Sequence, residues 1–174
     1  MEELGGEEIQ IILQTWNVDE WIDMSEEAFR TRFKNSEFHL LNSKEANLLS
    51  VARINFEFKV RIDQQEYSIA ELVGFVPVEI LKGHGKVLLG HISANLKERK
   101  VEAIGFCRKR TRPYYESVGL KVLRDKVKHI RERRNDEWIT LKEDDDIVVL
   151  TLEEPTIEIF EKLSDDLPAY LIFE

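Results

Sequence analysis

The sequence has little cysteine and no long hydrophobic run, and both absences exclude classes of protein. Cys107 is the only cysteine among 174 residues, so no disulfide can form within the chain and nothing indicates an oxidising compartment. No stretch approaches the roughly 18 consecutive apolar residues that a membrane-spanning helix needs. Residues 1–8 are acidic and lack the basic region and apolar core of a signal peptide. We therefore expect a cytoplasmic protein with no membrane partner.

Positive charge is in the minority as well. The net charge of −9 disfavours a general nucleic-acid binder, because such contacts rely on Lys and Arg. The basic residues nevertheless cluster in residues 108–112 and 124–134. Two interpretations of these clusters stay open, namely a solvated face balanced by acids elsewhere and a patch that binds RNA, and the net charge favours the first.

Histidine is scarce and scattered. His39, His91 and His129 are too far apart to indicate a metal site, and Cys107 has no candidate ligand beside it in the sequence. His84 is expected on the surface of a loop. We predict no metal cofactor.

The composition is otherwise typical of a soluble globular protein, with 43% hydrophobic and 34% charged residues. A chain of this length can bury a substantial core. No internal repeat or low-complexity linker divides it, so we predict one domain over residues 1–174.

Hydrophobic periodicity predicts a mixed α/β order without regular βα alternation. Helices are expected over residues 21–33, with a cap at 17–20, from the Gly83–Gly85 loop to about residue 100, from Thr111 to Gly119, and over 156–163. Strands are expected over residues 8–15, 37–41, 49–62, 67–78, 101–107, 120–123, 138–141, 147–152 and 169–173.

The most informative stretch is Gly83-His84-Gly85. It lies between a strand-like run at residues 71–78 and a helix whose apolar residues, from Leu88 to Leu96, have helical spacing. A glycine loop that opens a helix gathers free backbone N–H groups at the positive end of the helix dipole, which suits a phosphate or pyrophosphate. The alternative is a plain tight turn.

Three segments together resemble the GNAT superfamily of acyl-CoA-dependent N-acetyltransferases. The family's loop pattern, Arg or Gln, two residues, Gly, one residue, then Gly or Ala, falls on residues 80–85, although Ile80 stands at the usual basic or amide position. The second signature, an aromatic residue, Tyr, three residues, Gly and an apolar residue, falls on 114–120. A strand at residues 102–107 lies between them.

The resemblance implies a mixed α/β fold with a twisted, mostly antiparallel sheet flanked by helices. Acetyl-CoA would lie between two splayed central strands and pass its acetyl group to a primary amine of a small molecule by direct attack. A GNAT-fold binding module without acetyl transfer is the alternative, because isoleucine at position 80 cannot hydrogen-bond the ligand. The oligomeric state, a homodimer included, is left open.

The resemblance also implies roles for two side chains. Tyr115 aligns with the tyrosine that protonates the departing thiolate, and its alternative is a core aromatic. Glu71 is the candidate base, acting through water, in a strand where its neighbours are apolar. Its alternative is a solvent-facing strand residue.

The backbone is expected to hold acetyl-CoA. Gly74 is predicted to form a β-bulge whose N–H meets the oxyanion. The residues expected to bind the pantetheine arm are Val73, Gly74, Phe75 and Val76, and those expected to bind the pyrophosphate are Leu81, Lys82, Gly83, His84, Gly85 and Lys86.

Within the superfamily, the hairpin at residues 50–78 and the run at 144–150 resemble the aminoglycoside 2′-N-acetyltransferase branch. Aminoglycosides are polycations, so acidic side chains around the acceptor would suit them. The candidates are Asp144, Asp145, Asp146, Asp165, Asp166 and Glu174, with solvated loops as the alternative interpretation.

Overall fold

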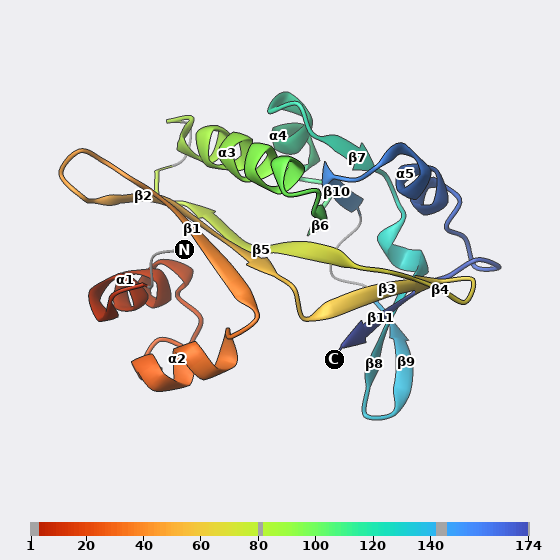
Figure 1. Cartoon of the computed structure of the whole chain (residues 1–174), viewed down its shortest axis with the longest axis horizontal. Coiled ribbons are helices and arrows are strands. Elements are labelled where there is room, and N and C mark those ends of the chain that lie inside the picture. Colours follow the sequence, from red (N-terminus) through yellow and green to blue (C-terminus); the bar gives the residue numbers. More distant parts are fainter. Residues whose placement is uncertain (1–3, 80–81, 142–145, 174) are drawn as a thin grey trace.

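The computed structural model describes residues 4–79, 82–141 and 146–173. Its strands form two sheets, and the chain passes from one sheet to the other more than once (Figure 1). The six-stranded sheet has the order β1 (Ser36–Asn42), β2 (Leu48–Asn55), β5 (Ile69–Pro77), β6 (Glu102–Cys107), β10 (Asp146–Thr151), β7 (Lys121–Leu123). The five-stranded sheet has the order β4 (Gln65–Tyr67), β3 (Phe58–Ile62), β11 (Ala169–Phe173), β8 (Ile130–Arg134), β9 (Glu137–Thr140).

The described pairs are antiparallel except for β5 with β6 and β11 with β8. The flanking elements are α1 (Gly6–Trp16), α2 (Glu26–Arg32), α3 (His84–Glu98), α4 (Arg112–Ser117), the 3-10 turn η1 (Val127–His129) and α5 (Glu154–Glu161). The predicted mixed α/β fold, a mostly antiparallel sheet flanked by helices, is confirmed.

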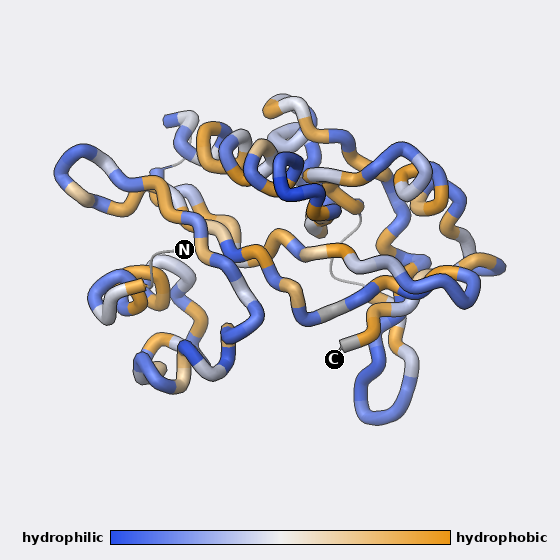
Figure 2. The backbone as a smooth tube through the Cα atoms, viewed as in Figure 1, coloured by the Kyte–Doolittle hydropathy of each residue, from blue (hydrophilic) through white to orange (hydrophobic). Residues whose placement is uncertain are grey.

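Successive side chains of a strand point to opposite faces of its sheet, and the apolar ones pack in three buried clusters. Ala70 and Leu72 of β5 pack with α3 on one face of the first sheet. On the other face, α1 and α2 cover β1 and β2 (Figure 1). The second sheet and α5 cover the rest of that face, where Ile69 and Ile104 join their core. Figure 2 shows the same arrangement, with hydrophobic residues along the strands and a hydrophilic tip on the β8–β9 hairpin.

The first expected strand is wrong, because residues 8–15 lie in helix α1. Ile9, Ile12, Leu13 and Trp16 recur at intervals of three and four residues, which places them on one face of a helix. The Glu8 carboxylate also accepts the backbone N–H of Gly5 at 2.9 Å, which caps the helix. These features outweigh the β-branched run that favoured a strand.

The second helix is shorter than expected. Asn17 ends α1 in a left-handed conformation with φ 49°, and turns follow it. Helix α2 begins only after Ser25, whose hydroxyl accepts the backbone N–H of Ala28 at 3.2 Å. The cap predicted at residues 17–20 is therefore wrong, and Ser25 takes that role.

The long strand expected over residues 49–62 is two strands in two sheets. The Asn55 side chain accepts the backbone N–H of Glu57 at 3.2 Å, a local turn that competes with the strand ladder. The chain therefore leaves the first sheet after β2 and enters the second at β3. Strand β8, inside the basic cluster at 124–134, was not predicted at all.

Candidate functional site

Strands β5 and β6 run in parallel but part after a short distance. Their pairing covers Ile69–Glu102 to Leu72–Gly105, and beyond these residues the two strands diverge. A hollow of about 250 Å³ opens where they separate. It is lined by Glu71, Leu72, Val73, Gly74, Phe75, Gly105, Phe106, Tyr115 and Val148.

The wall of this hollow formed by β5 carries the predicted bulge. In the register with β2, Val73 pairs with Arg53 and Val76 with Val51, so Gly74 and Phe75 together oppose one residue. Gly74 has φ 62°, the left-handed conformation that glycine adopts without strain. An added Cβ would also lie 2.8 Å from the Trp16 ring, so no larger residue fits.

Trp16 approaches this bulge from helix α1. Its indole N–H donates to the Gly74 carbonyl at 2.7 Å. The sequence does not predict a site role for Trp16, because the β-branched run at residues 8–15 favours a strand. Its position seven residues after Ile9 and three after Leu13, on the buried face of α1, is the sequence signal that would have found it.

Two tyrosines of α4 approach the hollow from the other side. The ring centroid of Phe75 lies 6.4 Å from that of Tyr115 and 6.2 Å from that of Tyr114. Tyr115 lines the hollow, while Tyr114 reaches the start of α3, where its Oη lies 2.5 Å from the position of a Cβ on Gly85. Burial raises the pKa of the Tyr114 hydroxyl, so it stays protonated at neutral pH.

The start of α3 is open on one side and packed on the other. Gly83 has φ 80° and no heavy atom within 4 Å of a built Cβ, and Lys82 and Lys86 are exposed. Gly85 is buried under Phe75 and Tyr114. His84 is half-buried, not a freely exposed loop residue, and its Nδ1 has no hydrogen-bond partner among the described residues. Ile80 and Leu81 lie outside the described residues.

Glu71 is half-buried on the face of β5 that is opposite to α3. Its carboxylate accepts a long hydrogen bond of 3.5 Å from the Asn55 amide. Arg53, on the neighbouring strand, stacks its guanidinium 4.8 Å from the ring centroid of Phe33. Burial lowers the pKa of Arg53, and the negative charge of Glu71 opposes that shift. Glu71 therefore lines the hollow and interacts with the half-buried cation of Arg53.

A buried ion pair fixes the start of α4. The Arg112 guanidinium donates to the two carboxylate oxygens of Asp146 at 2.7 and 2.9 Å, and the backbone N–H of Asp125 adds a third contact at 2.8 Å. The Asp146 side chain is fully buried. The expectation that Asp146 faces a cationic acceptor is therefore wrong, because its charge is already paired.

The structure does not bring all the expected residues to the hollow. Val76 packs in the cluster under α1 and α2 instead, because the bulge changes the face to which it points. Asp165 is exposed and bound to His129, and Asp144, Asp145 and Glu174 lie outside the described residues. Residues not expected in the site are Trp16, Asn55, Gly105, Phe106 and Val148.

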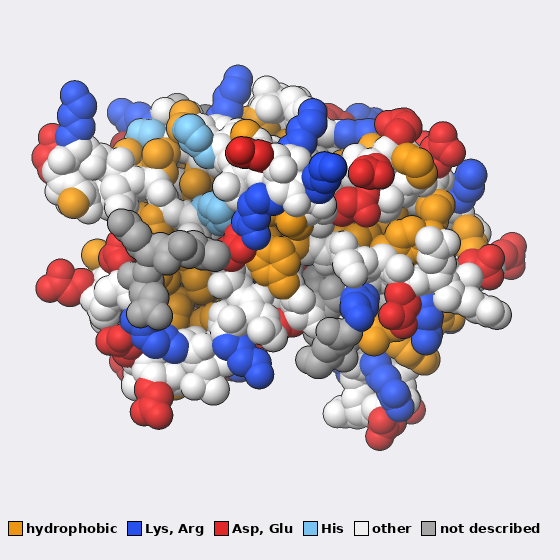
Figure 3. Space-filling view, viewed as in Figure 1, with side chains coloured by type: hydrophobic (Ala, Val, Ile, Leu, Met, Phe, Trp, Pro, Cys, Tyr) orange, Lys and Arg blue, Asp and Glu red, His pale blue; other side chains and the backbone are white. Residues whose placement is uncertain are grey.

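Several side chains of the two basic clusters are paired with acids. Arg124 contacts Glu116 at 2.7 Å, and Lys109 contacts Asp125 at 2.9 Å. Arg133 and Arg134 have partners in Asp136 and Glu132. Figure 3 shows Lys and Arg interspersed with Asp and Glu on the face in view, and a notch between the N-terminal helices and the β8–β9 hairpin. These pairs support a solvated face.

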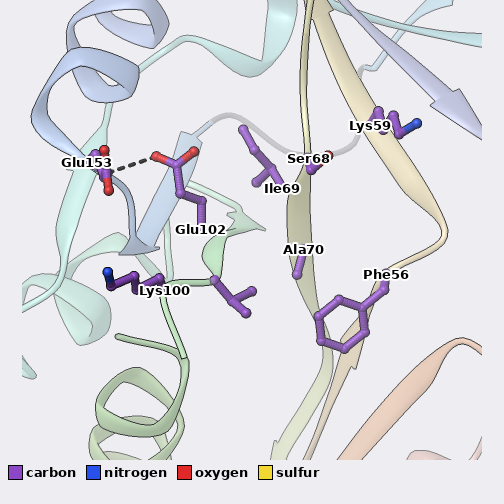
Figure 4. Close-up of a pocket in the computed structure, with 9 residues that line it drawn as sticks. Phe56, Lys59, Ser68, Ile69, Ala70, Lys100, Glu102 and Glu153 are labelled. Atoms are coloured by element: carbon purple, nitrogen blue, oxygen red, sulfur yellow. Dashed lines mark hydrogen bonds between the residues drawn. The ribbon is translucent and has the colours of Figure 1, made fainter. Parts of the chain in front are cut away.

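A larger hollow, of about 580 Å³, lies at the opposite end of the β5–β6 pair (Figure 4). The ammonium ends of Lys59 and Lys100 point away from each other, and Glu102 accepts the backbone N–H of Glu153 at 2.8 Å. The labelled polar side chains around this hollow do not converge on one point, so we assign it no ligand.

The described residues contain no group of three or more His, Cys, Asp or Glu placed to hold a metal ion. Within the same part of the chain, no helix combines the length and the apolar character needed to cross a bilayer.

Comparison with known proteins identifies the fold. No family model and no curated protein matches the sequence. Among solved structures, a GNAT-family acetyltransferase of Staphylococcus aureus Mu50 superposes with a TM-score of 0.52 at 13% identity, over 86% of this chain and 98% of its own. An acyl-CoA N-acyltransferase of Pseudomonas aeruginosa gives 0.50 at 12% identity, over 84% and 91%. A chimera of spermidine N-acetyltransferase from Vibrio cholerae gives 0.50 at 10% identity, over 84% and 90%. The chain therefore has the fold of GNAT acyl-CoA N-acyltransferases.

Proposed function

We propose that this protein is an acetyl-CoA-dependent N-acetyltransferase that acts on a primary amine of a small molecule, with residues 1–174 acting as one domain. One observation carries the proposal: β5 and β6 part at a glycine bulge, and the hollow between them contains both Glu71 and Tyr115. The GNAT-like fold also supports the proposal. So do the two sequence signatures of that superfamily, which lie at the loop leading into α3 and at α4.

The backbone groups around the hollow suit an extended, amide-bearing arm. Beyond Leu72 the described register gives Gly74 and Phe75 no partner in β6, so the Gly74 N–H and the Phe75 C=O can bind the pantetheine of acetyl-CoA, while the Gly74 carbonyl accepts the Trp16 indole N–H. The amides of Lys82–Lys86, at the positive end of α3, would hold the pyrophosphate. Lys82 and Lys86 are exposed there and add positive charge, and the first turn of α3 holds no acidic residue.

The side chains suit direct transfer. An alkylamine has a pKa near 10 and must lose a proton to attack the thioester carbonyl. Glu71 would accept that proton through water, and the bulge would donate a backbone N–H to the oxyanion. As the C–S bond breaks, Tyr115 would protonate the departing thiolate, and the nitrogen that has formed the new C–N bond would pass its extra proton to the resulting phenolate. No covalent intermediate with the protein is required.

The experiment measures acetyl-CoA binding first and transfer second. At a hundred times its dissociation constant, acetyl-CoA should add about 2.7 kcal/mol to the free energy of unfolding. Thiol release should then identify an acceptor in a panel of polyamines, aminoglycosides, amino acids and peptide N-termini. Spermidine belongs in that panel because one protein of the same fold acetylates it, and aminoglycosides because of the sequence resemblance.

Tyr115→Phe tests the role of the hydroxyl. We expect kcat to fall by at least about tenfold, since proton transfer by a positioned acid contributes that much or more, while the dissociation constant of acetyl-CoA changes little. Tyr67→Phe is the matched control, because Tyr67 belongs to strand β4 of the second sheet and does not line the hollow. Full activity of Tyr115→Phe on the best acceptor would exclude the role.

A binding module without transfer activity is the second candidate. Phe75 and Tyr114 pack closely on Gly85 at the start of α3, and the sequence has Ile80 where the family's loop has a basic or amide side chain. Stabilisation by acetyl-CoA without thiol release on any acceptor would favour this candidate, and so would the absence of stabilisation by any acyl-CoA.

A further inference from the structure

Trp16 is held in place by an aromatic cluster. It is the last residue of α1, and its ring centroid lies 5.8 Å from each of Trp21, Phe33 and Phe38. The backbone N–H of Asn17 closes the helix on the Leu13 carbonyl at 3.0 Å. Because both its ring and its backbone are fixed, the indole N–H has a defined direction.

That N–H makes its hydrogen bond at the position where β5 is out of register with β2 and no longer paired with β6. The acceptor is the Gly74 carbonyl, 2.7 Å away. Gly74 falls inside the register shift with β2 and beyond the last pair with β6. The register gives neither Gly74 nor Phe75 a partner residue in the two neighbouring strands, and the indole N–H provides a contact that fixes the carbonyl of this peptide.

The contact also sets the direction of the next N–H. The described peptide bonds are all trans, so the Gly74 carbonyl and the Phe75 N–H lie in one peptide plane and point in opposite directions. Since the carbonyl points to Trp16, the Phe75 N–H points away from the N-terminal helices. The Phe75 ring lies on that same far side, against Tyr114 and Tyr115 of α4.

We propose that Trp16 is a positioning residue: it orients the Gly74–Phe75 peptide so that the Phe75 N–H faces the thioester carbonyl of the acyl donor. This inference rests on the proposed function. Removing an oxyanion donor lowers kcat by about 10²–10³. Without the Trp16 contact the Phe75 N–H is still present but its direction is no longer fixed, so part of that effect is lost. We expect kcat to fall about tenfold.

The test compares Trp16→Phe with Trp21→Phe. Each variant removes one indole from the same aromatic cluster, but only Trp16 contacts Gly74. The readout is the infrared stretch of acetyl-CoA labelled with carbon-13 at the acetyl carbonyl, because an N–H donor lowers this frequency. It needs no acceptor amine. We expect the lowered frequency in the wild type and in Trp21→Phe, and a return toward the free value in Trp16→Phe.

Steady-state kinetics on the best acceptor give the second readout. For Trp16→Phe we expect kcat to fall about tenfold while KM for acetyl-CoA stays within about twofold, because the bond acts on the transition state more than on binding. A simple loss of packing would affect Trp21→Phe as well.

A tryptophan analogue of the same shape serves as a second test, in case Trp16→Phe disturbs the packing of the aromatic cluster. Trp16, Trp21 and Trp138 are the three tryptophans of the chain. In a Trp21→Phe, Trp138→Phe background, biosynthetic replacement of tryptophan by benzothienylalanine removes only the N–H of Trp16 and keeps its shape. We expect the same loss of the lowered carbonyl frequency.

The outcomes separate this inference from the function. If acetyl-CoA binds and its carbonyl frequency is the same with and without the Trp16 N–H, or is not lowered in the wild type, the positioning role is overturned and the proposed function stands. If the wild type does not bind acetyl-CoA at all, both are overturned.

Discussion

Asp146 shows how one buried carboxylate organises the approach to the hollow. Its side chain has no exposed surface, and its oxygens bind the start of α4 and the turn after β7 at once. A buried carboxylate is tolerated here because three hydrogen-bond donors, two of them from a guanidinium, replace its contacts with water. The placement of Tyr114 and Tyr115 therefore depends on a residue that touches neither of them in the described contacts.

Asp146→Asn should destabilise the protein by about 2–3 kcal/mol, because an amide cannot serve all three donors that the carboxylate satisfies. Glu116→Gln is the control. It breaks the exposed Arg124 ion pair and should cost no more than about 1 kcal/mol. Urea unfolding of both variants gives the comparison, and equal losses would contradict the buried role.

His39 predicts a pH dependence at the same scale. Its Nε2 is buried without a hydrogen-bond partner among the described residues, and burial lowers its pKa from 6.5, with Glu37 opposing and Arg99 assisting the shift. The unfolded chain therefore binds the proton more tightly than the folded chain. Stability from this residue is present above about pH 6.5 and is lost as the pH falls toward the folded pKa.

The check is the free energy of unfolding of the wild type and of His39→Gln between pH 7.5 and pH 5. The difference should narrow as the pH falls below about 6.5, with a slope of at most about 1.4 kcal/mol per pH unit. Parallel curves for the two proteins would show that His39 does not titrate differently on folding.

At the scale of elements, helix α3 contains two glycines in opposite surroundings. A Cβ on Gly85 would lie 2.5 Å from the Tyr114 hydroxyl and 2.8 Å from the Phe75 ring, while a Cβ on Gly90 would meet no heavy atom within 4 Å. The helix therefore provides its own matched pair of sites for the same substitution.

Gly85→Ala should destabilise the protein by about 1–3 kcal/mol through overpacking. Gly90→Ala should stabilise it by about 0.5–1 kcal/mol, because alanine favours the helix and nothing is displaced. Chemical denaturation measures both values. A stabilising Gly85→Ala would mean that Tyr114 and Phe75 move aside at little cost.

The elements also show what the sequence could predict. The α3 helix, strand β6 and the Tyr115 helix followed from periodicity and glycine spacing, because each is an uninterrupted local pattern. The break between β2 and β3 did not, because it depends on one Asn55 side chain competing with the ladder. The contact of Trp16 with Gly74 joins residues 58 positions apart, and no local pattern encodes it.

For the molecule as a whole, the two sheets share one core. Ile69, Ile104 and Ile147 of the first sheet pack in the same cluster as Val60 and Leu171 of the second. Separating the two sheets would expose the apolar surface of both. We infer that the described parts unfold together.

Trp138→Phe makes this testable, because the remaining tryptophans, Trp16 and Trp21, report only on the layer of α1 and α2. Tryptophan fluorescence and far-UV circular dichroism should give the same urea midpoint, and Leu171→Ala should lower both midpoints equally. Separate midpoints would show that the N-terminal layer unfolds on its own.

The central place of β11 has a consequence for biosynthesis. Strand β3 ends at Ile62 and β8 begins at Ile130, yet the strand that joins them side by side starts only at Ala169. Until the ribosome has made residues 169–173, both waiting strands keep an unpaired edge of N–H and C=O groups. The growing chain therefore exposes these edges to aggregation until β11 has emerged, and closure of this sheet comes after the β3–β4 and β8–β9 hairpins on either side of it.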